Sequence, residues 1–473
     1  MRRFRRTTLI TAGCLSALAG LGLARAVSFL PADWLFIFCP LLILLKRKGP
    51  TALLLVILLG LGVGLWRGTI YAQKLGELRS LSGQQVIIQA TATSDSVYSS
   101  GNQMEFTAGK AETIPSQQPL AGSFKISGFG VHMVYRGDVI RASGKLYPMR
   151  GSNQARIAYA QLAVVQVGHS WFNDLSRRFS AGMQNALPEP QSSFGMGLLI
   201  GQRINLPALV SAELVAVGLV HIVAVSGYNL TILIRGVQRL RLRSKYQQLA
   251  VSLALIGTFV TITGFSASIV RAALVSTLSL WAWYYGRRVK PAVLISFAAA
   301  LTGLINPFYV WGDMSWYLSF LAFFGVMIIA PVIQARLFKK SPKILTSVLI
   351  ETLSAELMTL PIIMLSFNQL SLVALLANVL IVPLVPVAML LAAVAGTAGM
   401  LIPQVAGWFA LPARLLLTYM LDIVHLLASI PSVLMHLSIS VTYMLVFYIA
   451  VLVIILVAHK HIKNKKPADF ARI

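Results

Sequence analysis

The chain has 473 residues, of which 57% are hydrophobic and only 11% are charged, a composition that excludes both an ordinary soluble enzyme and a disordered polypeptide. Its two cysteines, Cys14 and Cys39, exclude a disulfide framework and a cysteine-ligated metal centre. The 40 Lys and Arg residues against 14 Asp and Glu residues give a net charge of +26, part of which is expected from basic cytoplasmic loops.

Long apolar runs predict a polytopic α-helical membrane protein with about ten to eleven transmembrane segments, some of them broken. The first run, "TTLITAGCLSALAGLGLARA", is too long for a cleaved signal peptide and is typical of a retained signal anchor. Six basic clusters along the chain can all face the cytoplasm, so both termini are expected there, with the protein in the cytoplasmic (inner) membrane. Residues 1–66 are predicted to hold the N-terminal transmembrane helices, at 8–28, 33–45 and 50–66.

Residues 67–170 are of a different kind. "GQQVIIQATATSD" and "GDVIRASGKLY" alternate apolar and polar residues between Gly and Ser positions, as strands do. Five or six such strands predict a small extracytoplasmic β-barrel with an OB-like fold. Residues 67–178 carry twelve Lys and Arg against six Asp and Glu. Cytoplasmic loops of membrane proteins are enriched in Lys and Arg, but this enrichment does not explain a basic excess in a domain outside the cytoplasm.

OB folds hold single-stranded nucleic acid on one strand face, where cations contact phosphates and aromatic rings stack on bases. A spacer barrel with solvated charges is an equally good alternative, because aromatic residues are sparse in this region. The candidate nucleic-acid-binding residues are Lys110, Lys125, Phe129, Arg136, Arg141 and Lys145.

A second membrane block follows the barrel. Residues 171–190 predict an amphipathic helix at the membrane interface, residues 191–460 a second transmembrane domain, and residues 461–473 a basic cytosolic tail. Pro383 and Pro386 interrupt the apolar run over 371–401. The other predicted spans are 247–263, 265–286, 290–305, 313–335, 344–366, 404–428 and 439–458.

The stretch "HIVAVSGYNLTIL" places His221, Ser226, Gly227 and Asn229 in an apolar segment. Broken helices with polar residues line the permeation path of many transporters. Small-residue helix packing, with the Ser226 hydroxyl bonded to its own backbone, is the alternative.

Several ionisable residues also fall inside apolar segments, where burial is costly. Asp422 and His425 are spaced i,i+3 and are expected to pair with each other. Arg271 cannot shed its charge, so it requires an acidic partner, Glu356 or Asp313, a ring of carbonyl oxygens, or an anionic substrate. The sequence leaves these alternatives open.

Five blocks resemble, in their order and spacing, the ComEC competence family: "GLLIGQR", "GLVHIVAVSGYNLTILI", "FSASIVRAALV", "INPFYVWGDMSWYLSFLAFFGV" and "ETLSAELMTLPIIMLSFNQLSLVALLANVLIVPLVPV". The resemblance implies a membrane channel that takes up single-stranded DNA across the cytoplasmic membrane during natural transformation. Its channel-lining or strand-contacting residues are expected to be Arg203, His221, Ser226, Gly227, Tyr228, Asn229, Ser266, Arg271, Asp313, Glu356, Asn378 and Pro383.

Many members of that family continue into a metallo-β-lactamase-like hydrolase, whereas here "HKHIKNKK" offers only His459 and His461 as ligands. We therefore expect no enzymatic activity, no cofactor and no bound metal.

The expected partners are single-stranded DNA, the lipid bilayer, an external DNA receptor protein, a separate nuclease and a cytosolic helicase or single-strand-binding protein; a homo-oligomer is left open. No phosphate-binding loop for ATP occurs. The alternatives are a secondary transporter of a small anion and a non-transporting scaffold of an envelope complex.

Overall fold

The structure is a computed structural model of the 473-residue chain, and its contacts divide it into two compact units. The first consists of Met1–Ser176 and Ser244–Tyr317, and the second of Arg177–Arg243 and Leu318–Ile473. The described residues are 4–28, 49–99, 103–131, 133–149, 153–168, 171–201, 206–223, 230, 234, 236–237, 244–263, 267–287, 290–338, 342 and 344–464.

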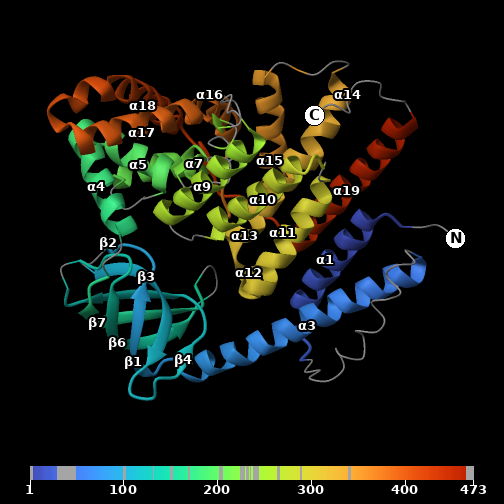
Figure 1. The fold of residues 1–473 in the computed structure, drawn as a ribbon, viewed down its shortest axis with the longest axis horizontal. Helices are drawn as coiled ribbons and strands as arrows, with labels where there is room; N and C mark the ends of the chain where they lie inside the picture. Colours follow the sequence, from blue (N-terminus) through green and yellow to red (C-terminus); the bar gives the residue numbers. More distant parts are fainter. Residues whose placement is uncertain are drawn as a thin grey trace. The chain divides into compact units, whose positions relative to one another are not determined.

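Helices α1 (Arg6–Leu23) and α3 (Pro50–Ser80) lie side by side in the first unit (Figure 1). Small residues allow this close approach: a Cβ added at Gly64 would lie against the carbonyl oxygen of Ala17 and 2.8 Å from the backbone nitrogen of Leu21. Gly60 makes a similar approach to the backbone of α1 one turn earlier. Because lipid supplies no hydrophobic drive between helices, close backbone packing at small residues is a main source of their association.

The predicted span over 50–66 lies within a helix that continues to Ser80. Its apolar part ends near Trp66, but "RGTIYAQKLGELRS" has few helix breakers, so the helix goes on. At 1.5 Å per residue its 31 residues measure about 46 Å, more than a hydrocarbon slab requires. The predicted boundary at residue 66 therefore falls inside the helix, and the first strand begins only at Gln85.

Among the described residues, the same unit also contains α9 (Lys245–Thr263), α10 (Ala267–Tyr284), α11 (Pro291–Ile305) and α12 (Phe308–Gly312). Arg67 of α3 closes the end of α11, because its Nε and Nη2 donate to the carbonyl oxygens of Leu304 and Ile305 at 2.9 and 3.1 Å. The indole nitrogen of Trp311 in α12 donates to the Leu21 carbonyl at the end of α1, at 2.7 Å. Carbonyl oxygens at helix ends have no partner within the helix, so these two side chains satisfy acceptors that the helices themselves leave open.

Seven strands form one sheet in the first unit, and the five longest close into a ring in the order β1-β3-β5-β7-β6 and back to β1. All of these pairings are antiparallel except β5 with β7. Alternate residues point inward and form the core, including Ile88, Phe124, Ile140 and Leu146. The strands are β1 (Gln85–Ala92), β2 (Val97–Ser99), β3 (Gln103–Thr113), β4 (Pro119–Leu120), β5 (Phe124–Phe129), β6 (Val139–Pro148) and β7 (Ala155–Gln166).

The regular elements described in the second unit are helices, apart from the short pair β8 (Leu370–Ser371) and β9 (Leu434–Met435). A five-residue π-helix, Gly325–Ile329, comes just before Pro331. Proline has no backbone N–H, so the regular i to i−4 hydrogen bonding of an α-helix is interrupted at this point. The other elements are α4 (Trp171–Ala186), α5 (Gln191–Ile200), α6 (Ala208–Ala216), α7 (Val220–Val223), α13 (Met314–Phe324), α14 (Ala330–Leu337), α15 (Ile344–Phe367), α16 (Ala374–Ile381), α17 (Val385–Leu401), α18 (Ala406–Ala428) and α19 (Val441–Asn464). Helices α4 and α13 begin in the first unit and end in the second.

Two sequence predictions about this unit can be compared with the structure. The break at Pro383 is confirmed, because a 3₁₀ turn over Val382–Leu384 separates α16 from α17. The amphipathic segment is a helix over Trp171–Ala186, and its second half packs on α17, where a Cβ added at Gly182 would lie 2.6 Å from the carbonyl oxygen of Gly396.

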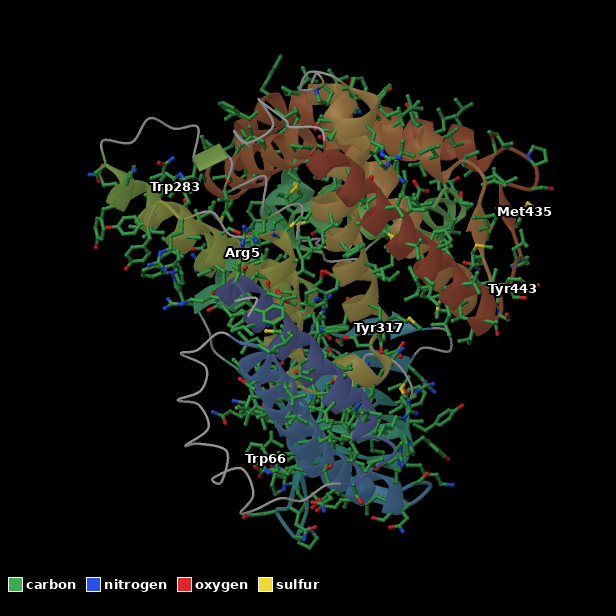
Figure 2. All side chains as sticks on the ribbon, turned by 90° about the vertical axis from the view of Figure 1, so that its right-hand side faces the viewer. Arg5, Trp66, Trp283, Tyr317, Met435 and Tyr443 are labelled. Atoms are coloured by element: carbon green, nitrogen blue, oxygen red, sulfur yellow. The ribbon has the colours of Figure 1, made fainter. Side chains whose placement is uncertain are left out.

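The chain is a membrane protein by the length and composition of its helices. Among the described residues, six helices are long and apolar enough to cross a bilayer: Arg6–Leu23, Pro50–Ser80, Met314–Leu337, Thr346–Phe367, Ala374–Leu401 and Pro403–Ala428. Exposed aromatic side chains lie where apolar stretches end, with Trp66 in α3, Trp283 in the last turn of α10 and Tyr443 in the first turn of α19 (Figure 2). Such rings are enriched at membrane–water interfaces.

Candidate functional site

One strand of the barrel displays a row of cationic and aromatic side chains. Arg141, Lys145 and Tyr147 are exposed on β6, whereas Ile140 and Leu146 on its other face are fully buried in the barrel core. The two faces follow from the two-residue period of a strand. This period therefore places two predicted DNA contacts, Arg141 and Lys145, on one outward face.

The neighbouring strand β7 adds Arg156 and Tyr159 to this face. Arg156 lies directly opposite Tyr147 in the β6–β7 register. The register shifts nearby, and Tyr159 adopts a left-handed conformation, with φ of 52°, that leaves its side chain 76% exposed. A β-bulge of this kind turns one side chain outward. The sequence analysis did not predict either residue. Ile157, Ala158 and Ala160 are all buried, so the two-residue alternation of the strand breaks there, and this break marks the bulge.

Strand β5, on the other side of β7, contributes Phe129, whose ring is 45% exposed and whose partner in the register is Gln161. We call the surface formed by Phe129, Arg141, Lys145, Tyr147, Arg156 and Tyr159 the β5–β7–β6 face. It carries three exposed rings and three cations on adjacent strands.

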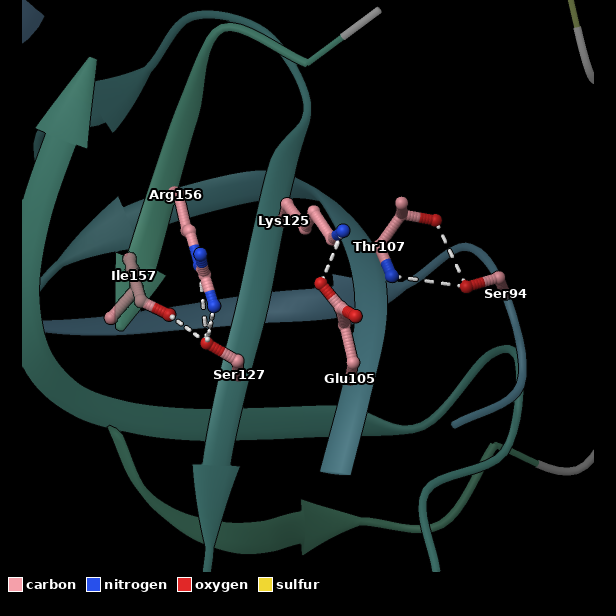
Figure 3. A network of polar contacts seen from close by, with 7 residues as sticks. All are labelled: Ser94, Glu105, Thr107, Lys125, Ser127, Arg156 and Ile157. Carbon is pink, nitrogen blue, oxygen red and sulfur yellow. Dashed lines mark hydrogen bonds and ion pairs between the residues drawn. The ribbon is translucent and has the colours of Figure 1, made fainter. Parts of the chain in front are cut away.

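Lys125, another predicted contact, is already engaged. Its ammonium forms an ion pair with Glu105 on β3, and Figure 3 shows this pair beside Ser127, which accepts hydrogen bonds from the Arg156 guanidinium at 3.1 and 3.3 Å. Partial burial, and to a smaller extent the Arg156 guanidinium, lowers the pKa of Lys125. A phosphate would have to compete with Glu105, so Lys125 is a weaker candidate contact than Lys145.

The last two predicted barrel residues lie elsewhere. Arg136 is half-buried: its backbone N–H donates to Asp95 at 2.8 Å and its guanidinium to the carbonyl oxygen of Thr261 in α9 at 3.5 Å. Lys110 is exposed on β3 in a left-handed conformation, where the β1–β3 register shifts. Neither belongs to the β5–β7–β6 face.

Arg271 is fully buried in the first unit, with 0% of its surface exposed. Its Nη2 donates to the carbonyl oxygen of Ser315 at 2.8 Å, and it interacts electrostatically with Asp313, which is 1% exposed. Asp313 in turn caps α13, because its Oδ1 accepts from the backbone N–H of Ser315 at 2.9 Å. Of the two proposed acidic partners, the structure therefore brings Asp313 to Arg271.

Glu356 forms a different contact, in the second unit. The side-chain amide of Asn378 in α16 donates to its Oε2 at 3.2 Å, so these two predicted channel residues meet each other. His221 is exposed, and its Nδ1 lies 3.1 Å from the carbonyl oxygen of Gly218. The predicted pair of Asp422 with His425 is wrong, because His425 contacts Glu213 of α6, Nδ1 to Oε1, at 2.6 Å.

Half of the predicted channel residues lie outside the described residues: Arg203, Ser226, Gly227, Tyr228, Asn229 and Ser266. The described part of the chain contains no group of three His, Cys, Asp or Glu side chains arranged to hold a metal ion.

Comparison with known proteins bears on the second membrane block. The family model described as "Competence protein" matches residues 198–461, which is more than half of the chain. A curated relative, "ComE operon protein 3" of Bacillus subtilis (strain 168), is 28% identical over 213 residues, which cover 44% of this chain and 27% of the relative. No solved structure matches.

Proposed function

We propose that this chain, which belongs to the competence protein family, carries a single strand of DNA across the cytoplasmic membrane during natural transformation. The β5–β7–β6 face is the observation that carries the proposal. A strand of DNA has a phosphate charge at every nucleotide and a base that can stack on an exposed ring. Three cations and three rings on adjacent strands match both features.

We further propose that the barrel is an OB-type domain. The ring of five long strands with a single parallel contact, β5 with β7, supports this assignment. OB folds bind extended single strands across their sheet surface, with weak sequence preference. The barrel would then collect and align the strand outside the membrane.

We propose the path through the bilayer at two places: the segment Ser226-Gly227-Tyr228-Asn229, where the sequence predicts a broken helix, and the 3₁₀ turn that contains Pro383. The buried Arg271 is better explained as a structural cation, since the Ser315 carbonyl oxygen accepts a hydrogen bond from it and Asp313 interacts with it electrostatically. Weak contacts along the path suit a strand that must keep sliding. The pull would come from a cytosolic helicase or single-strand-binding protein, a separate nuclease would degrade the other strand, and a receptor protein would deliver DNA from outside.

For the topology we propose about ten to eleven transmembrane segments, some of them broken, with both termini in the cytoplasm and the barrel outside. The basic clusters of the sequence support this orientation.

Replacing Arg141 and Lys145 together by glutamine is expected to weaken binding of a labelled single-stranded oligonucleotide to the purified full chain. Each lost phosphate contact reduces the slope of log affinity against log salt by about 0.7, so the double variant should lose about 1.4. Titrations at several salt concentrations measure this slope.

Lys125→Gln is the matched control, because Lys125 is a barrel lysine already paired with Glu105, and its salt slope should stay near that of the wild type. An unchanged slope in the Arg141→Gln/Lys145→Gln variant would contradict a strand-binding role for this face.

In cells, a deletion strain complemented with this chain should take labelled DNA into the cytosol. Proton-driven uptake of a small anion by reconstituted protein, with no DNA import, would favour the transporter alternative. Loss of complex formation without loss of any flux would favour a scaffold.

A further inference from the structure

A carboxyl group and an amide face each other between two segments that can cross the membrane. Glu356 lies in the middle of α15 and Asn378 in α16, and both helices belong to candidate membrane spans. The Asn378 Nδ2 donates to the Glu356 Oε2 at 3.2 Å. Asn378 is only 4% exposed and Glu356 is half-buried.

The hydrogen bonds of Asn378 are incomplete as they stand. Its Oδ1 is buried and accepts no hydrogen bond from any described residue. A buried amide oxygen without a donor costs about 1–3 kcal/mol. An ionised Glu356 has only acceptor oxygens, so it cannot supply the missing donor and would add repulsion between its charge and the amide oxygen.

Glu356 has no cationic partner in the part of the chain that the structure describes. Of the elements packed on α15, the π-helix, α16 and β8 have no titratable side chain. Helix α14 has Arg336, and the described side chains of α19 include Tyr443 and Tyr448, whose hydroxyl donates to the Met358 carbonyl oxygen at 2.9 Å. On α15 itself, Glu351 accepts from Ser347 at 3.3 Å.

We propose that Glu356 and Asn378 form a proton-binding site in which a protonated Glu356 donates its O–H to Asn378 Oδ1 while accepting from Asn378 Nδ2. The two groups then make a reciprocal acid–amide pair that satisfies every polar atom between them. Release of the proton breaks one of the two hydrogen bonds and leaves a charge within the membrane-spanning part of α15. The site therefore links one proton to the contact between α15 and α16, a property separate from strand binding by the barrel.

Labelling with dicyclohexylcarbodiimide tests this site in the full chain reconstituted in phosphatidylcholine vesicles. A protonated carboxyl adds across the carbodiimide, and the O-acylisourea rearranges to a stable N-acylurea that peptide mass spectrometry locates. Glu351, five residues earlier on the same helix, is the internal control because its carboxyl accepts a hydrogen bond from the Ser347 hydroxyl rather than from an amide. At neutral pH we expect Glu356 to be labelled at least about tenfold more than Glu351, a ratio of protonated fractions that corresponds to about 1.4 kcal/mol. Equal labelling of the two, or labelling of Glu351 alone, would overturn the proposal.

Infrared spectroscopy gives an independent readout. The C=O stretch of a protonated carboxyl should be present in the wild type, absent in Glu356→Gln and retained in Glu351→Gln. Glutamine can form the same reciprocal pair with Asn378, so the variant is expected to fold. Should it fail to fold, the labelling of the unmodified chain still decides. Neither measurement involves DNA, so a failed strand-binding experiment would leave this result standing, and the reverse holds as well.

Discussion

Arg271→Gln is expected to lower the free energy of unfolding by about 3–5 kcal/mol, the cost of removing one partner from a buried charged pair. Asp313 would remain 1% exposed with its charge uncompensated, and the Ser315 carbonyl oxygen would lose the guanidinium that donates to it. The loss should appear as a lower Tm of the detergent-solubilised full chain and as a lower protein level in the membrane.

A double variant separates this structural role from contact with DNA. Asn is a good helix cap, so Asp313→Asn keeps an oxygen for the Ser315 N–H while removing the charge. We expect Arg271→Gln/Asp313→Asn to recover a substantial part of the lost stability, because no unbalanced charge remains. A normal Tm for Arg271→Gln together with abolished DNA import would show instead that Arg271 acts on the strand.

Gly64→Val is expected to destabilise the chain by about 3 kcal/mol, at the upper end of the range for overpacking. The added Cβ would meet the backbone of α1 at Ala17 and Leu21, and backbone atoms cannot rotate away as a flexible side chain can. The helices α1 and α3 would have to separate along their whole contact. Thermal unfolding of the full chain in detergent measures the effect.

Gly62→Val is the matched control for Gly64→Val. It lies on the same helix two residues earlier, and a Cβ there would find nothing within 4 Å. Both variants replace glycine by the same β-branched residue, so the difference between their Tm values isolates the contact with α1. Equal losses for the two variants would contradict glycine-mediated packing of this pair.

The positions of most elements follow from the sequence, because hydrophobic periodicity and proline act locally. The apolar runs predicted the helices over 247–263 and 290–305 to within two residues, and Pro383 predicted the break between α16 and α17. The family resemblance is confirmed over residues 198–461. Alternation predicted the strands of the barrel, although their closure into a ring depends on pairings between residues far apart in the chain.

The partners of polar side chains could not be predicted in the same way. His425 pairs with Glu213, which is 212 residues away, rather than with Asp422 on its own helix, since helical spacing makes a contact feasible without excluding a better one from another helix. Arg271 had two acidic candidates, and only the fold brings Asp313 to it. Tyr159 joins the candidate site because a bulge reverses the alternation that would have decided its direction.

The hydrogen bonds of Arg67 carry a consequence for biogenesis. This arginine closes the end of α11 although 237 residues separate it from Leu304. During synthesis the N-terminal pair α1–α3 emerges first, and the carbonyls of Leu304 and Ile305 find their donor only when α11 reaches that pair. The helices α1 and α3 therefore form a surface against which α11 can pack as it inserts into the membrane. A chain without them would leave the carbonyl oxygens of Leu304 and Ile305 without this donor.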